Sequence, residues 1–264
     1  MRTRTAWISM LLWCATLAMA NATVQPTGIL IDPDRTFARA AQAYDDGDYA
    51  QALELYEQML QAGYDHRALR FNLGNTLYRL GKPGHAVAQF RRAWRDAPRD
   101  ADILTNLGHV QRQAGAIPHQ LSLFERIWSR LSPGEWATLA TIGWWGGTLL
   151  LATSFHDRRR RQGLRKAAAC CGALLLLAAP GVQYWRSAGS LREAVVVGAG
   201  YQAKFAPLEG AQAHFDVPQG TLVRVREEAQ GWVRIALNEK TGWLPRAACS
   251  MVLADGTPWR GSGS

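Results

Sequence analysis

Residues 67–100 read RALRFNLGNTLYRLGKPGHAVAQFRRAWRDAPRD, and several of these positions recur elsewhere in the chain. Asn72-Leu73-Gly74 returns 34 positions later as Asn106-Leu107-Gly108. Three glycines keep the same interval: Gly47, Gly81 and Gly115. A fixed period of this length is typical of stacked helix pairs, because a single pair cannot bury its apolar face alone. The sequence therefore predicts an all-α repeat array.

The stretch resembles the tetratricopeptide repeat. The residues that carry the resemblance are Phe71-Asn72-Leu73-Gly74-Asn75, then Gly81, Ala86, Phe90, Ala93 and Pro98. The resemblance implies an array over residues 33–115, in which the third copy keeps only its first helix, residues 101–115. In this interpretation, Gly74 and Gly108 let paired helices approach closely.

The family resemblance also implies a binding surface. The first helix of each repeat lines a concave groove that receives peptides or partner helices. We expect this groove to contain Phe37, Tyr44, Phe71, Asn75, Tyr78, Thr105, His109 and Arg112. The alternative is that several of these rings pack between helices and contact no partner.

Residues 116–132 carry an apolar stripe at helical spacing. Its members are Leu121, Phe124, Ile127, Trp128 and Leu131. This pattern suits a helix that caps the array, and it equally suits a helix lying in the membrane interface. We expect one amphipathic helix here, capping the array, next to the membrane, or both.

Two uncharged segments follow, residues 136–155 and 167–185, and each is long enough to cross a bilayer. Of the formal net charge of +9, residues 156–166 between them carry +5, from six basic residues and one acidic residue. Short basic loops stay in the cytoplasm, so two transmembrane helices with a cytoplasmic loop are predicted. The alternative is a helical hairpin buried in a globular core. Basic residues concentrated beside apolar segments also argue against nucleic-acid binding.

The first 20 residues resemble a secretory signal peptide. A short basic region precedes an apolar stretch, residues 6–20, which ends in Ala18-Met19-Ala20. The alternative is an uncleaved anchor, for which this stretch is short. A signal peptide sends the array outward, in agreement with the loop charges. We therefore predict a bacterial inner-membrane protein with two spans and with both soluble regions in the periplasm.

Beyond residue 193 the apolar period changes to that of strands. Runs of β-branched and aromatic residues cover 194–197, 221–226, 232–237 and 242–244. The paired Gly231-Trp232 and Gly242-Trp243 motifs make residues 194–253 similar to a bacterial SH3 domain, which implies an all-β barrel. Trp232 and Trp243 are either core residues or part of a ligand face. Residues 254–264 form a tail.

The sequence contains no recognisable catalytic motif. Its six histidines follow no metal-ligand spacing, and its cysteines form no disulfide framework on the exported side. There is no nucleophile motif, phosphate-binding loop or dinucleotide glycine pattern. We therefore predict a protein that is not an enzyme and that has no cofactor and no metal.

The order of these segments resembles the E-type proteins of the bacterial aerotolerance (Bat) operons. The tract Leu123-Phe124-Glu125-Arg126-Ile127-Trp128 with Leu131-Ser132-Pro133-Gly134-Glu135-Trp136 is similar to that family's entry into the membrane. The resemblance implies a complex with von Willebrand A-domain proteins and a MoxR-type ATPase, linked to stress or oxygen tolerance. The predicted function is a non-catalytic scaffold. The alternative is a peptidoglycan-binding sensor or adaptor that recruits a cell-wall enzyme.

Overall fold

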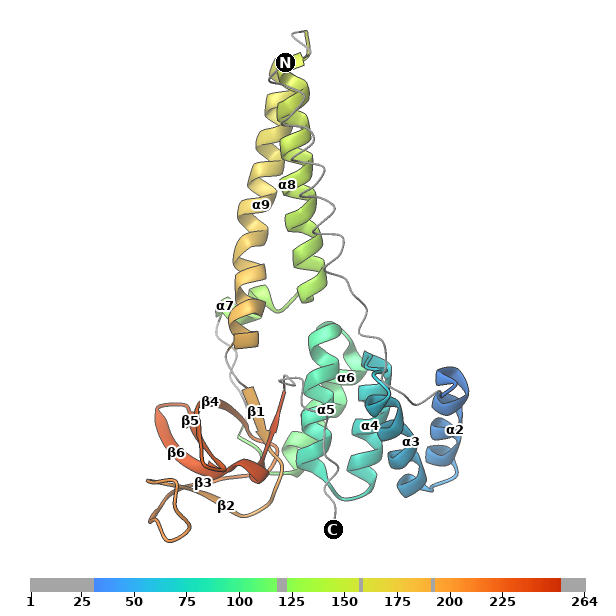
Figure 1. The fold of residues 1–264 in the computed structure, drawn as a ribbon, viewed down its shortest axis with the longest axis vertical. Helices are drawn as coiled ribbons and strands as arrows, with labels where there is room; N and C mark the ends of the chain where they lie inside the picture. Colours follow the sequence, from blue (N-terminus) through green and yellow to red (C-terminus); the bar gives the residue numbers. More distant parts are fainter. Residues whose placement is uncertain (1–30, 118–122, 157–158, 191–192, 253–264) are drawn as a thin grey trace.

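The computed structural model describes residues 31–117, 123–156, 159–190 and 193–252. Five helices form an array, seven strands form a sheet, and two long helices form a hairpin (Figure 1). The array and the sheet lie together at one end of the hairpin (Figure 1). The predicted signal peptide, residues 1–20, and the tail, residues 254–264, lie outside the described residues.

The array consists of two complete helix pairs and a fifth helix. Its bounds are α2 Pro33–Asp45, α3 Tyr49–Gln61, α4 Arg67–Arg79, α5 Pro83–Asp96 and α6 Ala101–Gln113. Asp32, Asp48 and Asp100 cap α2, α3 and α6 by accepting backbone N–H bonds. The three glycines of the 34-residue period follow α2, α4 and α6 with φ between +67° and +84°, a conformation that favours glycine. The repeat period thus marks the helix ends.

Close packing within the second pair depends on Gly74. A Cβ at this position would lie 2.8 Å from the ring of Phe90, which is completely buried. Gly108, its counterpart in the third copy, has only the side chain of Arg112 within reach. The expected close approach at Gly108 is therefore not made, because no helix among the described residues packs against α6 at this glycine.

The C-terminal region is a seven-stranded antiparallel sheet with the order β3-β2-β6-β5-β4-β1-β7. The strands are β1 Glu193–Val196, β2 Tyr201–Lys204, β3 Ala213–Val217, β4 Leu222–Ala229, β5 Trp232–Leu237, β6 Lys240–Pro245 and β7 Cys249–Met251. Val223, Val225, Val233 and Ile235 are buried, while Arg226 and Arg234 on the same strands are exposed, as the alternating pattern predicts. The sequence gives no comparable signal for β3 and β7, which are short.

The sheet packs directly on the array. Val195, Leu222 and Val252 belong to the same buried cluster as Val87 of α5 and Val110 of α6. A Cβ at Gly84 would lie 2.7 Å from the Cα of Val197, so α5 touches the sheet backbone. The sheet therefore covers the end of the array that a further repeat would otherwise cover.

Polar contacts reinforce this junction. The Arg92 guanidinium donates to the carbonyl oxygen of Val252 at 3.2 Å and to that of Met251. The backbone N–H of Ile117 donates to Thr221 Oγ1 at 3.2 Å. Burial and the neighbouring Arg70 lower the pKa of Arg92 to about 10, so it remains charged at neutral pH. The two bonds from Arg92 satisfy backbone carbonyls at the C-terminal end of the sheet.

The segment expected to cap the array has a different arrangement. Only Leu123–Trp128, α7, is helical among the described residues of this stretch, and it packs against α9. Leu123 and Ile127 are largely exposed. The sheet covers the end of the array, while Trp128 and Leu131 of the predicted stripe pack against the buried cluster that contains Trp94 and Ile103.

The hairpin consists of α8 Pro133–His156 and α9 Arg161–Ser190, which pack side by side (Figure 1). A capping box starts α8, because Ser132 and Glu135 each accept the other's backbone N–H. A Cβ on Gly143 would lie 3.0 Å from the Cys171 carbonyl oxygen, so close packing within the hairpin uses this glycine. Because α9 begins at Arg161, half of the predicted basic loop is helical.

By length and composition, one helix among the described residues is apolar enough to cross a membrane. It is the segment Arg161–Trp185 of α9, with a mean hydropathy of 1.6. The tryptophan, threonine and glycine residues of α8 lower its hydropathy, and α8 does not meet the same criterion. The prediction of two spans is therefore supported for one of them.

The base of the hairpin is anchored in the protein. Trp136 and Trp185 are 9% and 5% exposed, and Trp185 packs 5.7 Å from the ring of Trp94 on α5. Their indole N–H groups donate to the carbonyl oxygens of Trp128 and Leu131, both at 2.9 Å. Tryptophans at the ends of apolar segments often lie at the lipid headgroups. Trp136 and Trp185 instead join the hairpin to the array, because their rings are buried in the cluster that contains Trp94 and their indole N–H groups have backbone acceptors.

The contact between α5 and the sheet gives a first prediction. Replacing Gly84 with alanine forces a methyl group against the backbone of residues 196–197, and we expect a loss of about 1–3 kcal/mol in the free energy of unfolding. Gly134→Ala is the matched control, because both glycines follow a proline at a helix start and nothing lies within 4 Å of the Gly134 position. Denaturant unfolding of the detergent-solubilised chain measures both. Equal stability of the two variants would contradict the packing described.

Candidate protein-binding groove

The predicted groove residues lie on α2, α4 and α6, the first helices of the three copies. Two hydrogen-bonded links join α4 to α6. Tyr78 Oη donates to Gln113 Oε1 at 2.7 Å and lies 3.2 Å from His109 Nε2. Asn106 Nδ2 donates to Asn75 Oδ1 at 3.0 Å. The structure therefore brings Asn75, Tyr78 and His109 together on one face.

Several predicted rings pack into the array, as the alternative interpretation proposed. Phe37 contacts Tyr56 at 5.8 Å between ring centroids, and Phe71 contacts Phe90 at 5.7 Å. Both Phe37 and Phe71 are only partly buried, so one side of each ring remains accessible. Thr105, His109 and Arg112 on α6 are exposed. The accessible part of the groove is thus more polar than its sequence suggested.

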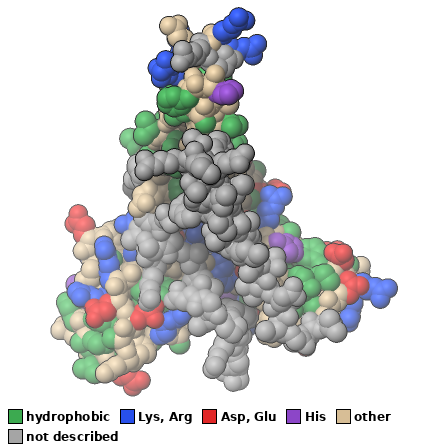
Figure 2. Space-filling view, turned by 45° about the horizontal axis from the view of Figure 1, so that its top comes forward, with side chains coloured by type: hydrophobic (Ala, Val, Ile, Leu, Met, Phe, Trp, Pro, Cys, Tyr) green, Lys and Arg blue, Asp and Glu red, His purple; other side chains and the backbone are tan. Residues whose placement is uncertain are grey.

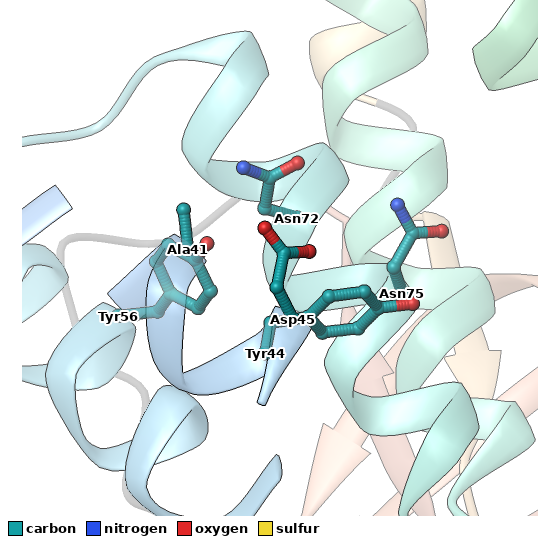
Figure 3. Close-up of a pocket in the computed structure, with 6 residues that line it drawn as sticks. All are labelled: Ala41, Tyr44, Asp45, Tyr56, Asn72 and Asn75. Atoms are coloured by element: carbon teal, nitrogen blue, oxygen red, sulfur yellow. The ribbon is translucent and has the colours of Figure 1, made fainter. Parts of the chain in front are cut away.

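A pocket of about 170 Å³ opens between α2, α3 and α4 (Figure 3). It is lined by Ala41, Tyr44, Asp45, Tyr56, Asn72 and Asn75. Only Tyr44 and Asn75 were among the predicted site residues. Asn72 was visible in the sequence only as part of the repeated Asn-Leu-Gly, and Tyr56 only as an aromatic residue 34 positions before Phe90. Neither signal distinguishes a packing residue from one that lines a pocket.

Tyr56 has an unusual position in this pocket. Its side chain is completely buried, and its hydroxyl makes no hydrogen bond to any described residue. Burial raises the pKa of Tyr56, and the neighbouring Asp45 carboxylate raises it further against the effect of the Asn72 amide. The hydroxyl is therefore protonated at neutral pH and available as a donor and an acceptor.

The two tryptophans of the sheet are partly exposed and lie outside its buried cluster. Trp243 is paired with Arg234 on one side and with Lys204 on the other, which places the three side chains on one face. Lys204 Nζ lies 5.4 Å from the ring centroid of Trp232. This face therefore combines aromatic rings with positive charges.

Groups with catalytic or metal-binding potential are few in the described part of the chain. It contains no cluster of three His, Cys, Asp or Glu residues that could hold a metal ion. Cys170, Cys171 and Cys249 are free thiols. Burial raises the pKa of Cys249 to about 12, which keeps this thiol protonated and unreactive.

Comparison with known proteins identifies the array. The sequence model of the tetratricopeptide repeat family matches residues 43–105, which extend from the end of α2 into α6. No curated protein and no solved structure matches the chain significantly. The chain thus contains a tetratricopeptide-repeat array, a module that binds other proteins and is typically a non-catalytic scaffold.

Proposed function

We propose that this protein is a membrane-anchored, non-catalytic scaffold that presents two binding modules on the periplasmic side of a bacterial inner membrane. The observation that carries the proposal is the position of the array and the sheet, which pack on each other at one end of the hairpin (Figure 1). If the hairpin crosses the bilayer, both modules lie on the same side of it. The array supplies the groove for a protein partner.

The distribution of charge supports this orientation. Arg159, Arg160, Arg161, Arg165 and Lys166 gather at the tip of the hairpin, opposite the two modules (Figure 2). Large apolar side chains between the tip and the modules are exposed on both helices: Ile142, Trp144, Leu149, Phe155, Leu176 and Leu177. An exposed apolar band that ends in basic residues is typical of a span with its basic end in the cytoplasm. We therefore propose that α8 crosses the membrane beside α9.

The order of segments also supports a place in a larger assembly. Its resemblance to the E-type Bat proteins suggests von Willebrand A-domain proteins and a MoxR-type ATPase complex as partners, with a role in stress or oxygen tolerance. We propose that the groove of the array recruits one of these proteins. We further propose that the C-terminal sheet is an SH3-like module.

Two exposed lysines test the orientation. We expect a membrane-impermeant amine reagent to label Lys240 in intact spheroplasts and Lys166 only after permeabilisation, because the two lie at opposite ends of the hairpin. Mass spectrometry of the purified chain measures both sites, and Lys166→Arg identifies the signal from the tip. Labelling of Lys166 in intact spheroplasts would place the tip outside and overturn the orientation.

The groove is tested by crosslinking in native membranes, followed by identification of the captured proteins. We expect Tyr78→Ala and Arg112→Ala each to reduce partner recovery several-fold, because Tyr78 joins the groove helices α4 and α6 and Arg112 is exposed on α6. Arg126→Ala is the control, because it removes an exposed arginine on α7, outside the groove. Unchanged recovery with both groove variants would show that the partner binds elsewhere.

A second candidate function is peptidoglycan binding by the sheet, as a sensor or adaptor that recruits a cell-wall enzyme. It is favoured by the accessible Trp232 and Trp243 rings beside Lys204. Aromatic faces suit the apolar faces of sugar rings, and a lysine suits the carboxylates of the cell-wall peptide. This face is separate from the groove, so the two functions are compatible.

Retention on purified sacculi tests this candidate. If it holds, the full-length chain in detergent co-sediments with sacculi, and Trp232→Leu reduces retention several-fold because it keeps apolar bulk but removes the aromatic ring. Leu208→Ala, which changes an exposed apolar residue on a nearby loop, is the control. A full-length chain that stays in the supernatant would exclude peptidoglycan as the ligand of this face.

A further inference from the structure

The pocket between α2, α3 and α4 contains a polar group without a partner. Tyr56 forms part of its lining, is 0% exposed, and its hydroxyl makes no hydrogen bond to the described residues. The Asn72 amide is close enough to lower the pKa of Tyr56, but the geometry between the amide and the hydroxyl is not that of a hydrogen bond. An unpaired buried hydroxyl costs about 1–3 kcal/mol. A ligand group that enters the pocket and bonds to Tyr56 would recover this cost.

The size of the pocket suits a side chain better than a single water molecule. Its volume is about 170 Å³, roughly ten times the ~10–15 Å³ that one water requires. The exposed Asp45 lines the pocket together with the fully buried Tyr56, so the pocket extends from the surface into the array (Figure 3). An elongated side chain with a polar end fits this arrangement.

The charge of the pocket comes from Asp45. Its two acidic neighbours are already engaged, because Asp46 accepts from Gln42 Nε2 at 2.9 Å and Asp48 caps α3. Asp45 makes no ion pair with a described residue. Arg79 interacts with Tyr44 of the pocket lining and lies over the ring of Tyr49, at 5.5 Å from its centroid, and it forms no ion pair with Asp45. The pocket therefore carries the negative charge of Asp45.

We infer that this pocket binds a cationic side chain, a lysine or an arginine, of the protein that occupies the groove. This inference rests on the proposed function of the groove. An ammonium or guanidinium group donates several hydrogen bonds, and Asp45, the Asn72 amide oxygen and the Tyr56 hydroxyl are acceptors for them.

Other classes of side chain fit less well. A carboxylate would meet the charge of Asp45 at close range. An apolar side chain would cover Asp45 and leave both it and the Tyr56 hydroxyl without partners, at a cost in desolvation. The groove thus selects its partner partly through the position of one basic residue.

Selection of peptides tests this inference. Full-length protein in lipid nanodiscs is used to select peptides from a random phage-displayed library, and Tyr78→Ala identifies those that bind through the groove. We expect these peptides to share a lysine or an arginine at one position. Replacing that residue with norleucine should weaken binding at least about tenfold, as for loss of a charge-assisted hydrogen bond.

Two variants locate the basic residue. Asp45→Asn should weaken binding of the peptides at least about tenfold. Asp46→Asn removes the same charge from the adjacent position, which lies outside the pocket, and should change binding little. Tyr56→Phe should weaken binding without lowering the thermal stability of the free protein, because its hydroxyl has no protein partner to lose. If the hydroxyl were needed for packing, the Tyr56→Phe variant would instead have a lower thermal stability than the unmodified protein.

The outcomes separate the two proposals. Groove-dependent peptides without a shared basic residue, or equal effects of Asp45→Asn and Asp46→Asn, would overturn the inference and leave the groove intact as a binding site. Failure to select any groove-dependent peptide would count against the proposed function of the groove itself, and the inference would fall with it.

Discussion

Helix α5 is buried on three sides, and the arrangement of the whole molecule depends on it. Phe90 packs against Gly74 of α4 and holds the second repeat together. Val87 and Arg92 contact the sheet, and Trp94 contacts the base of the hairpin. One helix of 14 residues thus connects all three parts. Because interiors are close-packed, a shift of α5 relative to one part would disturb the other two.

This use of α5 leaves the opposite side of the array accessible. In each pair the second helix lies behind the first, and the sheet and the hairpin contact the array mainly through α5. Phe71 of α4 packs against the buried cluster that includes Trp136 and Trp185 of the hairpin, whereas Thr105, His109 and Arg112 on α6 remain exposed. The accessible part of the groove is therefore concentrated on α6.

Much of the array was predictable, because its signals are local and repeated. Gly81 and Gly115 mark helix ends through their backbone conformation, which depends on the residue itself. The contact of Gly84 with Val197 was not predictable, since the two residues are far apart in sequence and no pattern links them. For the same reason, no pattern in the sequence links Trp136 and Trp185 to Trp94 of the array, although the three rings share one buried cluster.

The candidate site was predictable only in part. Sequence spacing identifies the helices that line a groove and therefore Asn75 and Tyr78. It does not show which neighbouring ring has an unsatisfied hydroxyl, because that depends on the positions of atoms from three helices. Tyr56 occupies a position where the repeat period predicts a packing ring, and it is one. Its second property, an unpaired polar atom lining a pocket, appears only in three dimensions.

The packing of the sheet against α5 and α6 has a consequence for how this molecule can evolve. Repeat proteins ordinarily lengthen by duplicating a unit at either end, since each new copy rests on an identical surface. Here the surface that would receive another copy is already occupied by Val195 and Leu222 of the sheet. Lineages that gain repeats can therefore insert them only ahead of Pro33, so the array lengthens sideways from the hairpin axis while its junction with the sheet stays constant (Figure 1).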